Sequence, residues 1–222
     1  MTERELRVFD DLDGLVATAV DLFVEEKPRS IALSGGSTPK PVYERLAYLN
    51  YPWADVDVFF GDERCVPPDH PDSNFGMANE ALLSKVSARV HTMYNCEAEA
   101  YEADLRAVFG DVAVPSIDLN FLGIGDDGHT ASLFPGNPAL DVTDRWVAYV
   151  PEPGMPPPHP RLTLTFPVHD ASKLAVFLVS GEKKRERVRQ LMDDADIPAA
   201  RVHAQRIVVL ADRAAAGWGR GS

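Results

Sequence analysis

The chain has 222 residues, of which 45% are hydrophobic and 25% are charged, proportions that are typical of a globular protein and exclude a disordered chain. Its formal net charge of −12 repels phosphate backbones and anionic lipid surfaces, which disfavours nucleic-acid and membrane-surface functions. If the ligand is itself an anion, the basic residues that bind it must be gathered locally.

The apolar residues predict helices that alternate with strands. Between Asp11 and Glu26 they recur at helical spacing, and Pro28 ends the pattern. Apolar runs predict strands at 30–33, 56–60, 117–124, 146–150, 162–166, 174–179 and 207–210, and the segments between them predict helices at 39–49, 74–86, 97–109, 182–192 and 212–216. We therefore predict an α/β fold, with a largely parallel central sheet flanked by helices, in a single domain spanning residues 1–222.

The cysteines and the apolar segments indicate the cellular setting. Cys65 and Cys96 form neither a CxxC pair nor a Cys/His cluster at zinc-ligand spacing, so we expect reduced thiols and no structural metal. The first residues lack a cationic stretch followed by an apolar run, and no segment approaches the about 18 continuous apolar residues of a membrane span. A cytoplasmic location is expected.

Ligands of open α/β sheets collect beyond the carboxyl ends of the strands, where three unusual loops are predicted to lie. The first loop has the sequence SGGSTPK. Gly35 and Gly36 permit special backbone geometry, Ser37 or Thr38 can cap the following helix, and Pro39 suits its first turn. The free amides favour a phosphate, although the spacing matches no nucleotide-binding motif; a capped turn without a ligand is the alternative.

The second loop carries three consecutive charged residues, Asp62, Glu63 and Arg64, directly after a buried strand. The guanidinium group of Arg64 is suited to bidentate binding of phosphate. A solvated turn with an internal ion pair is an equally good interpretation of this loop alone.

The third loop, GIGDDGHTASLFPG, carries Asp127 and His129 among glycines. Histidine can exchange a proton near neutral pH, and a neighbouring carboxylate can fix its tautomer and raise its basicity. A lone histidine is more often structural, but the clustering of three such loops favours catalysis. Arg161 and Lys184 could neutralise a phosphate from the far side of the same pocket.

Together these segments resemble the 6-phosphogluconolactonases, within the wider group of glucosamine-6-phosphate deaminase and ribose-5-phosphate isomerase. The segments LSGGSTPK, FFGDERCVPPDHPDSN, GIGDDGHTASLFPG, PPPHPRLTLTFPV and SGEKK occur in the family's order and spacing over nearly the whole chain. The resemblance implies hydrolysis of 6-phospho-D-glucono-1,5-lactone to 6-phosphogluconate, the second step of the oxidative pentose phosphate pathway. It implies a sugar-phosphate substrate and no cofactor or metal; we expect a monomer or weak homodimer with no nucleic-acid or membrane partner.

The resemblance and the residue types together suggest a mechanism. The 6-phosphate is expected to be bound by backbone amides and cationic side chains from seven residues: Gly35, Gly36, Ser37, Thr38, Arg64, Arg161 and Lys184. His129 is expected to act as a general base on a water that attacks C1, held by Asp127 or Asp62, and to return the proton to the leaving ring oxygen.

Two rival functions are compatible with the same fold. Deaminases of the group carry DGHIAFNEP, in which a glutamate five residues after the histidine assists ring opening. Phe134 occupies that position here, which removes an acid/base group that isomerisation needs and lactone hydrolysis does not. A non-catalytic sugar-phosphate sensor usually carries a fused basic helical module, and the sequence shows no such extension.

Overall fold

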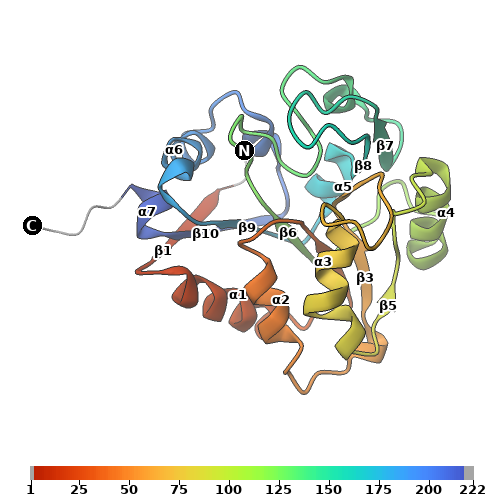
Figure 1. Cartoon of the computed structure of the whole chain (residues 1–222), viewed down its shortest axis with the longest axis horizontal. Coiled ribbons are helices and arrows are strands. Elements are labelled where there is room, and N and C mark those ends of the chain that lie inside the picture. Colours follow the sequence, from red (N-terminus) through yellow and green to blue (C-terminus); the bar gives the residue numbers. More distant parts are fainter. Residues whose placement is uncertain (1–2, 218–222) are drawn as a thin grey trace, which may run out of the picture.

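A seven-stranded parallel sheet forms the centre of the computed structural model, which describes residues 3–217 (Figure 1). The strands lie side by side in the order β1-β10-β9-β6-β2-β3-β5. Their bounds are β1 (Arg4–Phe9), β2 (Ser30–Leu33), β3 (Asp57–Phe60), β5 (Arg89–Val90), β6 (Leu119–Leu122), β9 (Leu174–Val179) and β10 (Arg206–Asp212). The predicted α/β class with a largely parallel sheet is confirmed.

Helices cover both faces of this sheet. They are α1 (Leu12–Glu26), α2 (Lys40–Leu46), α3 (Asn74–Ala81), α4 (Ala98–Phe109), α5 (Phe166–Ala171), α6 (Arg185–Met192) and α7 (Arg213–Ala216). Short 3₁₀ helices are η1 (Trp53–Asp55), η2 (Leu83–Lys85), η3 (Pro138–Asp141), η4 (Glu182–Lys184) and η5 (Pro198–Arg201). In Figure 1, α1 and α2 lie on one side of the sheet and α6 on the other.

The strand side chains divide into two hydrophobic clusters, because successive residues of a strand point to opposite faces. In β9, Val176 and Leu178 pack with the α1–α4 side, whereas Phe177 and Val179 pack with the α6–α7 side. The sheet is therefore buried on both faces. This burial explains why its strands are continuous apolar runs.

The N-terminus of α1 follows a local sequence signal, whereas that of α2 does not. The side chain of Asp11 accepts a hydrogen bond from the amide of Gly14 and caps α1, as the N-terminal signal predicts. In α2 the N-cap is Pro39, with no side-chain capping bond, so the prediction that Ser37 or Thr38 caps this helix is wrong.

A second, antiparallel sheet of three strands, in the order β4-β8-β7, was not expected from the sequence. Its strands are β4 (Asp62–Arg64), β7 (Val147–Val150) and β8 (Arg161–Leu164). The chain changes sheet at Gly61, whose amide donates to Leu33 of β2 while its carbonyl accepts from Leu164. The charged segment predicted as a loop is thus a strand, and the strands predicted at 146–150 and 162–166 do not join the parallel sheet.

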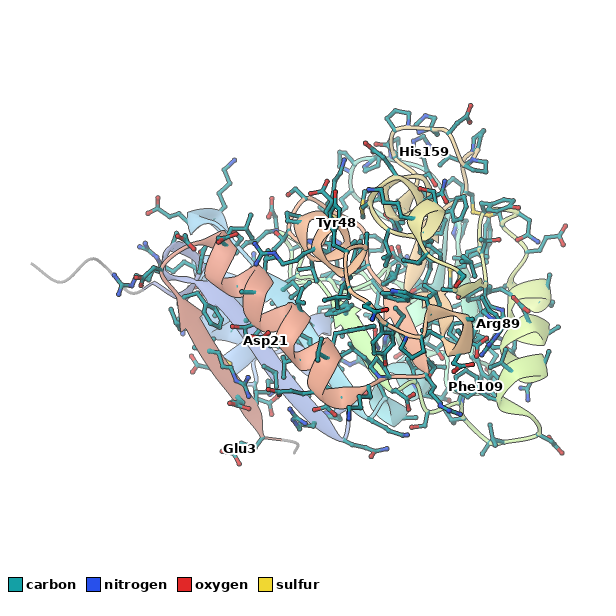
Figure 2. All side chains as sticks on the ribbon, turned by 90° about the horizontal axis from the view of Figure 1, so that it is seen from below. Glu3, Asp21, Tyr48, Arg89, Phe109 and His159 are labelled. Atoms are coloured by element: carbon teal, nitrogen blue, oxygen red, sulfur yellow. A yellow bond between two sulfur atoms is a disulfide. The ribbon has the colours of Figure 1, made fainter. Side chains whose placement is uncertain are left out.

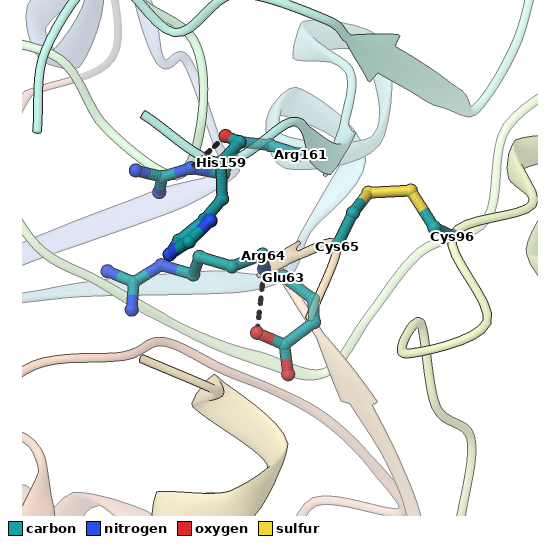
Figure 3. Close-up of a disulfide and its surroundings, with 6 residues drawn as sticks. All are labelled: Glu63, Arg64, Cys65, Cys96, His159 and Arg161. Atoms are coloured by element: carbon teal, nitrogen blue, oxygen red, sulfur yellow. Dashed lines mark hydrogen bonds between the residues drawn. A yellow bond between two sulfur atoms is a disulfide. The ribbon is translucent and has the colours of Figure 1, made fainter. Parts of the chain in front are cut away.

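The expectation of reduced thiols is also wrong, because Cys65 and Cys96 form a disulfide (Figure 3). Their Cα atoms are 5.2 Å apart although the residues are 31 positions apart in the chain. Cys65 follows β4, and Cys96 lies between β5 and α4. Only the tertiary fold brings these segments together, so no local spacing could reveal the pair. Among residues 3–217, no helix combines the length and the apolar character that crossing a membrane requires.

Candidate active site

A pocket of about 150 Å³ lies beyond the carboxyl ends of β2 and β6, which are neighbours in the parallel sheet. It is lined by Ser34, Gly35, Gly36, Asp62, Arg64, Asn74, Gly123, Ile124, Gly125, His129, Ala131 and Arg161. Segments from both sheets and from the start of α3 therefore meet at one place. The glycine turn and the histidine of the DGH segment open into the same pocket.

His129, which lines this pocket, is paired with Asp127, which does not line it. Its Nδ1 lies 2.6 Å from Oδ1 of Asp127, and its backbone N–H donates to the same oxygen at 3.0 Å. Burial raises the pKa of Asp127, but the hydrogen bonds from His129 outweigh it and hold this pKa below its usual value. An ionised carboxylate at Nδ1 favours the tautomer with the proton on Nδ1, which leaves Nε2 free to accept a proton.

Gly125 leaves room for the imidazole of His129, because it has no side chain. The amide of Gly125 donates to the carbonyl of His129 at 2.8 Å, which closes the loop on itself. A β-carbon at residue 125 would lie 2.0 Å from both Cε1 and Nδ1 of His129. Only glycine leaves this space to the imidazole, so the spacing of the GDDGH segment follows from the packing of its histidine.

Asp62, the other carboxylate expected to hold His129, has different partners. Its side chain accepts hydrogen bonds from Oγ of Ser132 at 2.6 Å and from Nδ2 of Asn74 at 3.3 Å. It lines the pocket but has no hydrogen bond to the imidazole. Within the described residues, Asp127 is the carboxylate that orients His129.

Glu63 has a structural position. Its side chain is 1% exposed and accepts hydrogen bonds from the backbone amides of Arg64, Asn74 and Phe75. Burial raises the pKa of Glu63, and these hydrogen bonds offset part of the rise. The carboxylate therefore holds β4 to the start of α3 and does not line the pocket.

Arg64 and Arg161 lie opposite each other on adjacent strands of the small sheet, since they are directly paired in the β4–β8 register. Backbone carbonyls hold both: Arg64 donates to Asp72 at 2.5 Å, and Arg161 donates to His159 at 3.1 Å and to Pro157 at 2.9 Å. Figure 3 shows the two guanidinium groups extending the same way, away from the disulfide.

These arginines lack an anionic partner within the described part of the chain. No carboxylate lies within salt-bridge distance of either guanidinium there, and Nε of Arg64 is buried without a hydrogen-bond partner. Arg161 is 3% exposed, and its burial and the neighbouring charge of Arg64 lower its pKa despite the opposing effect of Asp62. A buried and a half-buried guanidinium group, neither of them in a salt bridge, are complementary to a dianion such as phosphate.

The glycine turn contributes backbone to the same region. Gly36 has a φ of +111°, which a residue with a side chain rarely adopts. A β-carbon at Gly35 would lie 1.8 Å from Oδ1 of Asn74, so the backbone of the turn approaches this amide closely. Asn74 was missed as a pocket residue, although it belongs to the DHPDSN segment that carries part of the family resemblance.

Three of the expected phosphate ligands do not line the pocket: Ser37, Thr38 and Lys184. The ammonium group of Lys184 is paired with Asp126, and Nε of Arg187 donates to the carbonyl of the same aspartate at 2.7 Å. These two contacts fasten the loop that carries His129 to η4 and α6.

Phe134 lies against the imidazole, with 4.5 Å between the two ring centroids. The guanidinium of Arg161 lies 5.7 Å from the centre of the same phenyl ring. The position at which the deaminase pattern has a glutamate therefore provides an apolar wall beside the histidine.

Comparisons with known proteins agree with this geometry. A family model described as glucosamine-6-phosphate isomerases/6-phosphogluconolactonase matches residues 7–210. The chain is 39% identical to a 6-phosphogluconolactonase of Nostoc, with 97% of this chain and 98% of the relative covered, and 41% identical to one of Synechocystis, with 86% and 84% covered.

Solved structures show the same relationship. The 6-phosphogluconolactonase from Trypanosoma cruzi superimposes with a TM-score of 0.87 at 28% identity, over 98% of both chains. That of Thermotoga maritima gives 0.80 at 32% identity, over 96% of this chain and 100% of the other. A monomeric glucosamine-6-phosphate deaminase, 23% identical, shares the fold with a TM-score of 0.75 over 98% of this chain and 100% of the other. The chain therefore belongs to the glucosamine-6-phosphate isomerase/6-phosphogluconolactonase family.

Proposed function

We propose that this chain hydrolyses 6-phospho-D-glucono-1,5-lactone to 6-phosphogluconate, the second step of the oxidative pentose phosphate pathway. One observation carries the proposal: the His129–Asp127 pair and the unpaired Arg64 and Arg161 line or adjoin a single small pocket. A proton-transferring group and a phosphate-binding group are thus within reach of one ligand. The names of the relatives in Nostoc and Synechocystis support this choice of substrate.

The arginine pair is the proposed anchor for the 6-phosphate. Like charges directly opposite each other on paired strands destabilise a sheet. An anion between Arg64 and Arg161 removes this repulsion and accepts hydrogen bonds from both groups. The backbone of Gly35 and Gly36 borders the same space and supplies the proposed amide donors.

The chemistry then needs one base that becomes an acid. Nε2 of His129 takes a proton from a water molecule as the water oxygen bonds to C1 of the lactone. The bond between C1 and the ring oxygen breaks, and the imidazolium returns its proton to that oxygen. Asp127 stays ionised and stabilises the imidazolium in between. Asp62 does not contact the imidazole; its side chain accepts hydrogen bonds from Ser132 and Asn74 and holds these residues in place.

Phe134 is the observation that separates this function from deamination or isomerisation. Those reactions need a further acid/base group near the opened ring, and the deaminase glutamate supplies it. Here an aromatic ring packs on the imidazole at that position. Lactone hydrolysis is complete with one proton-transferring residue, so the pocket favours it.

The proposal is tested by His129→Ala. Loss of general acid–base help lowers kcat by about 10²–10⁴-fold at saturating lactone. Thermal stability changes little, because the imidazole is partly exposed. His203→Ala, which removes an exposed histidine that does not line the pocket, is the matched control and should keep wild-type turnover. Unchanged turnover in His129→Ala excludes this residue from the role.

We also propose that the enzyme acts in the cytoplasm as a monomer or weak homodimer. A phosphorylated lactone is a charged metabolite that stays inside the cell.

A further inference from the structure

Three side chains with metal-binding atoms lie next to the pocket arginines: His70, Asp72 and His159. Two imidazole nitrogens and one carboxylate oxygen of this His70–Asp72–His159 cluster lie within 4.8 Å of one another. Nε2 of His159 is 3.0 Å from Oδ2 of Asp72, and Nδ1 of His70 is 3.8 Å from the same oxygen. The cluster is separate from His129, and none of its members lines the catalytic pocket.

The distances between these donor atoms match those between neighbouring ligand atoms around one metal ion. Zinc binds nitrogen and carboxylate oxygen at about 2.0–2.2 Å, so neighbouring ligand atoms of a tetrahedral site are about 3.3 Å apart. The separations of 3.0 and 3.8 Å lie on either side of this value. The imidazole rings of His70 and His159 are nearly perpendicular, with an interplanar angle of 82°, and their centroids are 5.2 Å apart. Small side-chain rotations therefore suffice to point all three donor atoms at one ion.

The site is open enough for an ion to enter. The side chains of His70, Asp72 and His159 are 35%, 38% and 30% exposed. Figure 2 shows His159 on a loop at the surface of the molecule. Three protein ligands leave the fourth tetrahedral position to a water molecule.

We propose that His70, Asp72 and His159 bind one divalent transition-metal ion of the zinc class. The donor set decides the class, because imidazole nitrogen suits zinc, cobalt, nickel and copper, whereas magnesium and calcium require oxygen ligands. The carboxylate of Asp72 supplies negative charge between the ion and the neighbouring Arg161. This inference does not depend on the proposed lactonase activity.

The bound ion joins two segments that position the pocket arginines. The carbonyl of Asp72 accepts a hydrogen bond from Arg64. The carbonyl of His159 accepts one from Arg161 (Figure 3). Without an ion, these segments are connected by the contact between His159 and Asp72, by the pairing of β4 with β8, and by the hydrogen bond from the amide of Cys65 to the carbonyl of Pro160, at 2.8 Å. A metal bridge between Asp72 and His159 therefore stiffens the support of both guanidinium groups.

The test is calorimetric titration of the metal-stripped full-length protein with zinc chloride and, separately, with magnesium chloride. One zinc ion per chain and no magnesium are expected. Loss of a group that only supports a ligand already weakens metal binding by about 10–100-fold, so His70→Ala, Asp72→Asn and His159→Ala should each weaken zinc binding at least as much. His129→Ala and His203→Ala are the controls and should retain wild-type affinity.

Two results overturn the proposal. One is the absence of stoichiometric zinc binding to the wild-type protein, which leaves the cluster as a hydrogen-bonded His–Asp pair. The other is zinc binding that is lost in His129→Ala and kept in His159→Ala, which assigns the ion to the catalytic pair. If a variant fails to fold, cobalt absorption of the wild type decides: intense tetrahedral bands support the site, and a weak spectrum like that of aqueous cobalt contradicts it.

Discussion

Gly125→Ala is the replacement that most directly tests the geometry of the catalytic pair. The added β-carbon would lie 2.0 Å from Cε1 and Nδ1 of His129. Carbon atoms in contact are about 3.5–4.0 Å apart, so the imidazole has to move by about 1.5 Å or more. It then loses the 2.6 Å contact between its Nδ1 and Asp127. The backbone hydrogen bond of residue 125 to His129 remains available, because alanine keeps the amide.

The size of the effect follows from this displacement. A misplacement of about 1 Å at a catalytic group costs about 100-fold in rate, or about 2.7 kcal/mol in activation free energy. We expect kcat of Gly125→Ala to fall by about this factor, measured with lactone generated in situ and a dehydrogenase that oxidises the 6-phosphogluconate product.

Gly123→Ala is the matched comparison, because a β-carbon at residue 123 meets no protein atom within 4 Å and leaves the imidazole in place. Since Gly123 also lines the pocket, the two variants are compared by kcat at saturating lactone. The loss of kcat in Gly123→Ala should be at least about tenfold smaller than that in Gly125→Ala. If folded Gly125→Ala keeps wild-type turnover, the observed position of the imidazole is not required for the reaction, and the proposed role of the Asp127 contact is refuted.

Two further predictions concern stability. Replacing Cys65 and Cys96 by serine removes a cross-link that spans 31 residues of sequence, which should lower the free energy of unfolding by about 3–4 kcal/mol in the chain-entropy account. Denaturant unfolding of the wild type with and without reductant checks this, and equal midpoints would show that the cross-link adds nothing. Burial lowers the pKa of His169 from its usual 6.5 to about 4. Between pH 6.5 and pH 4, the unfolded state therefore binds a proton that the folded state does not. Stability is therefore fully present above pH 6.5 and lost as pH falls toward 4, by up to about 1.4 kcal/mol per pH unit. His169→Gln should flatten this slope in urea unfolding measured across the same range, and a wild-type slope in the variant would assign it to other groups.

The parallel sheet could be predicted because each buried strand is a compact apolar run. The bounds at 30–33 and 174–179 agree with those of β2 and β9. β4 could not be predicted, since three consecutive charged residues have no strand pattern and their place is fixed by pairing with β8. β1 was missed for another reason: its residues are only partly buried at the edge of the sheet.

The meeting of the glycine turn with His129 could be predicted from fold logic, because loops after neighbouring parallel strands share one edge. The pairing of Lys184 with Asp126 could not, since these residues are 58 positions apart and their contact depends on how η4 packs. The same holds for His159 and Asp72, which are 87 positions apart. Contacts of this kind depend on tertiary structure and have no local sequence pattern.

The order of the strands also constrains how the protein is made. Within residues 3–217, β1 precedes every other strand, and its partner in the sheet, β10, follows all of them. Until β10 has been synthesised, β1 lacks this neighbour and the adjacent edge of β9 is open to other chains. The nascent polypeptide therefore carries two exposed hydrogen-bonding edges that a chaperone can protect, and insertion of β10 between them completes the sheet.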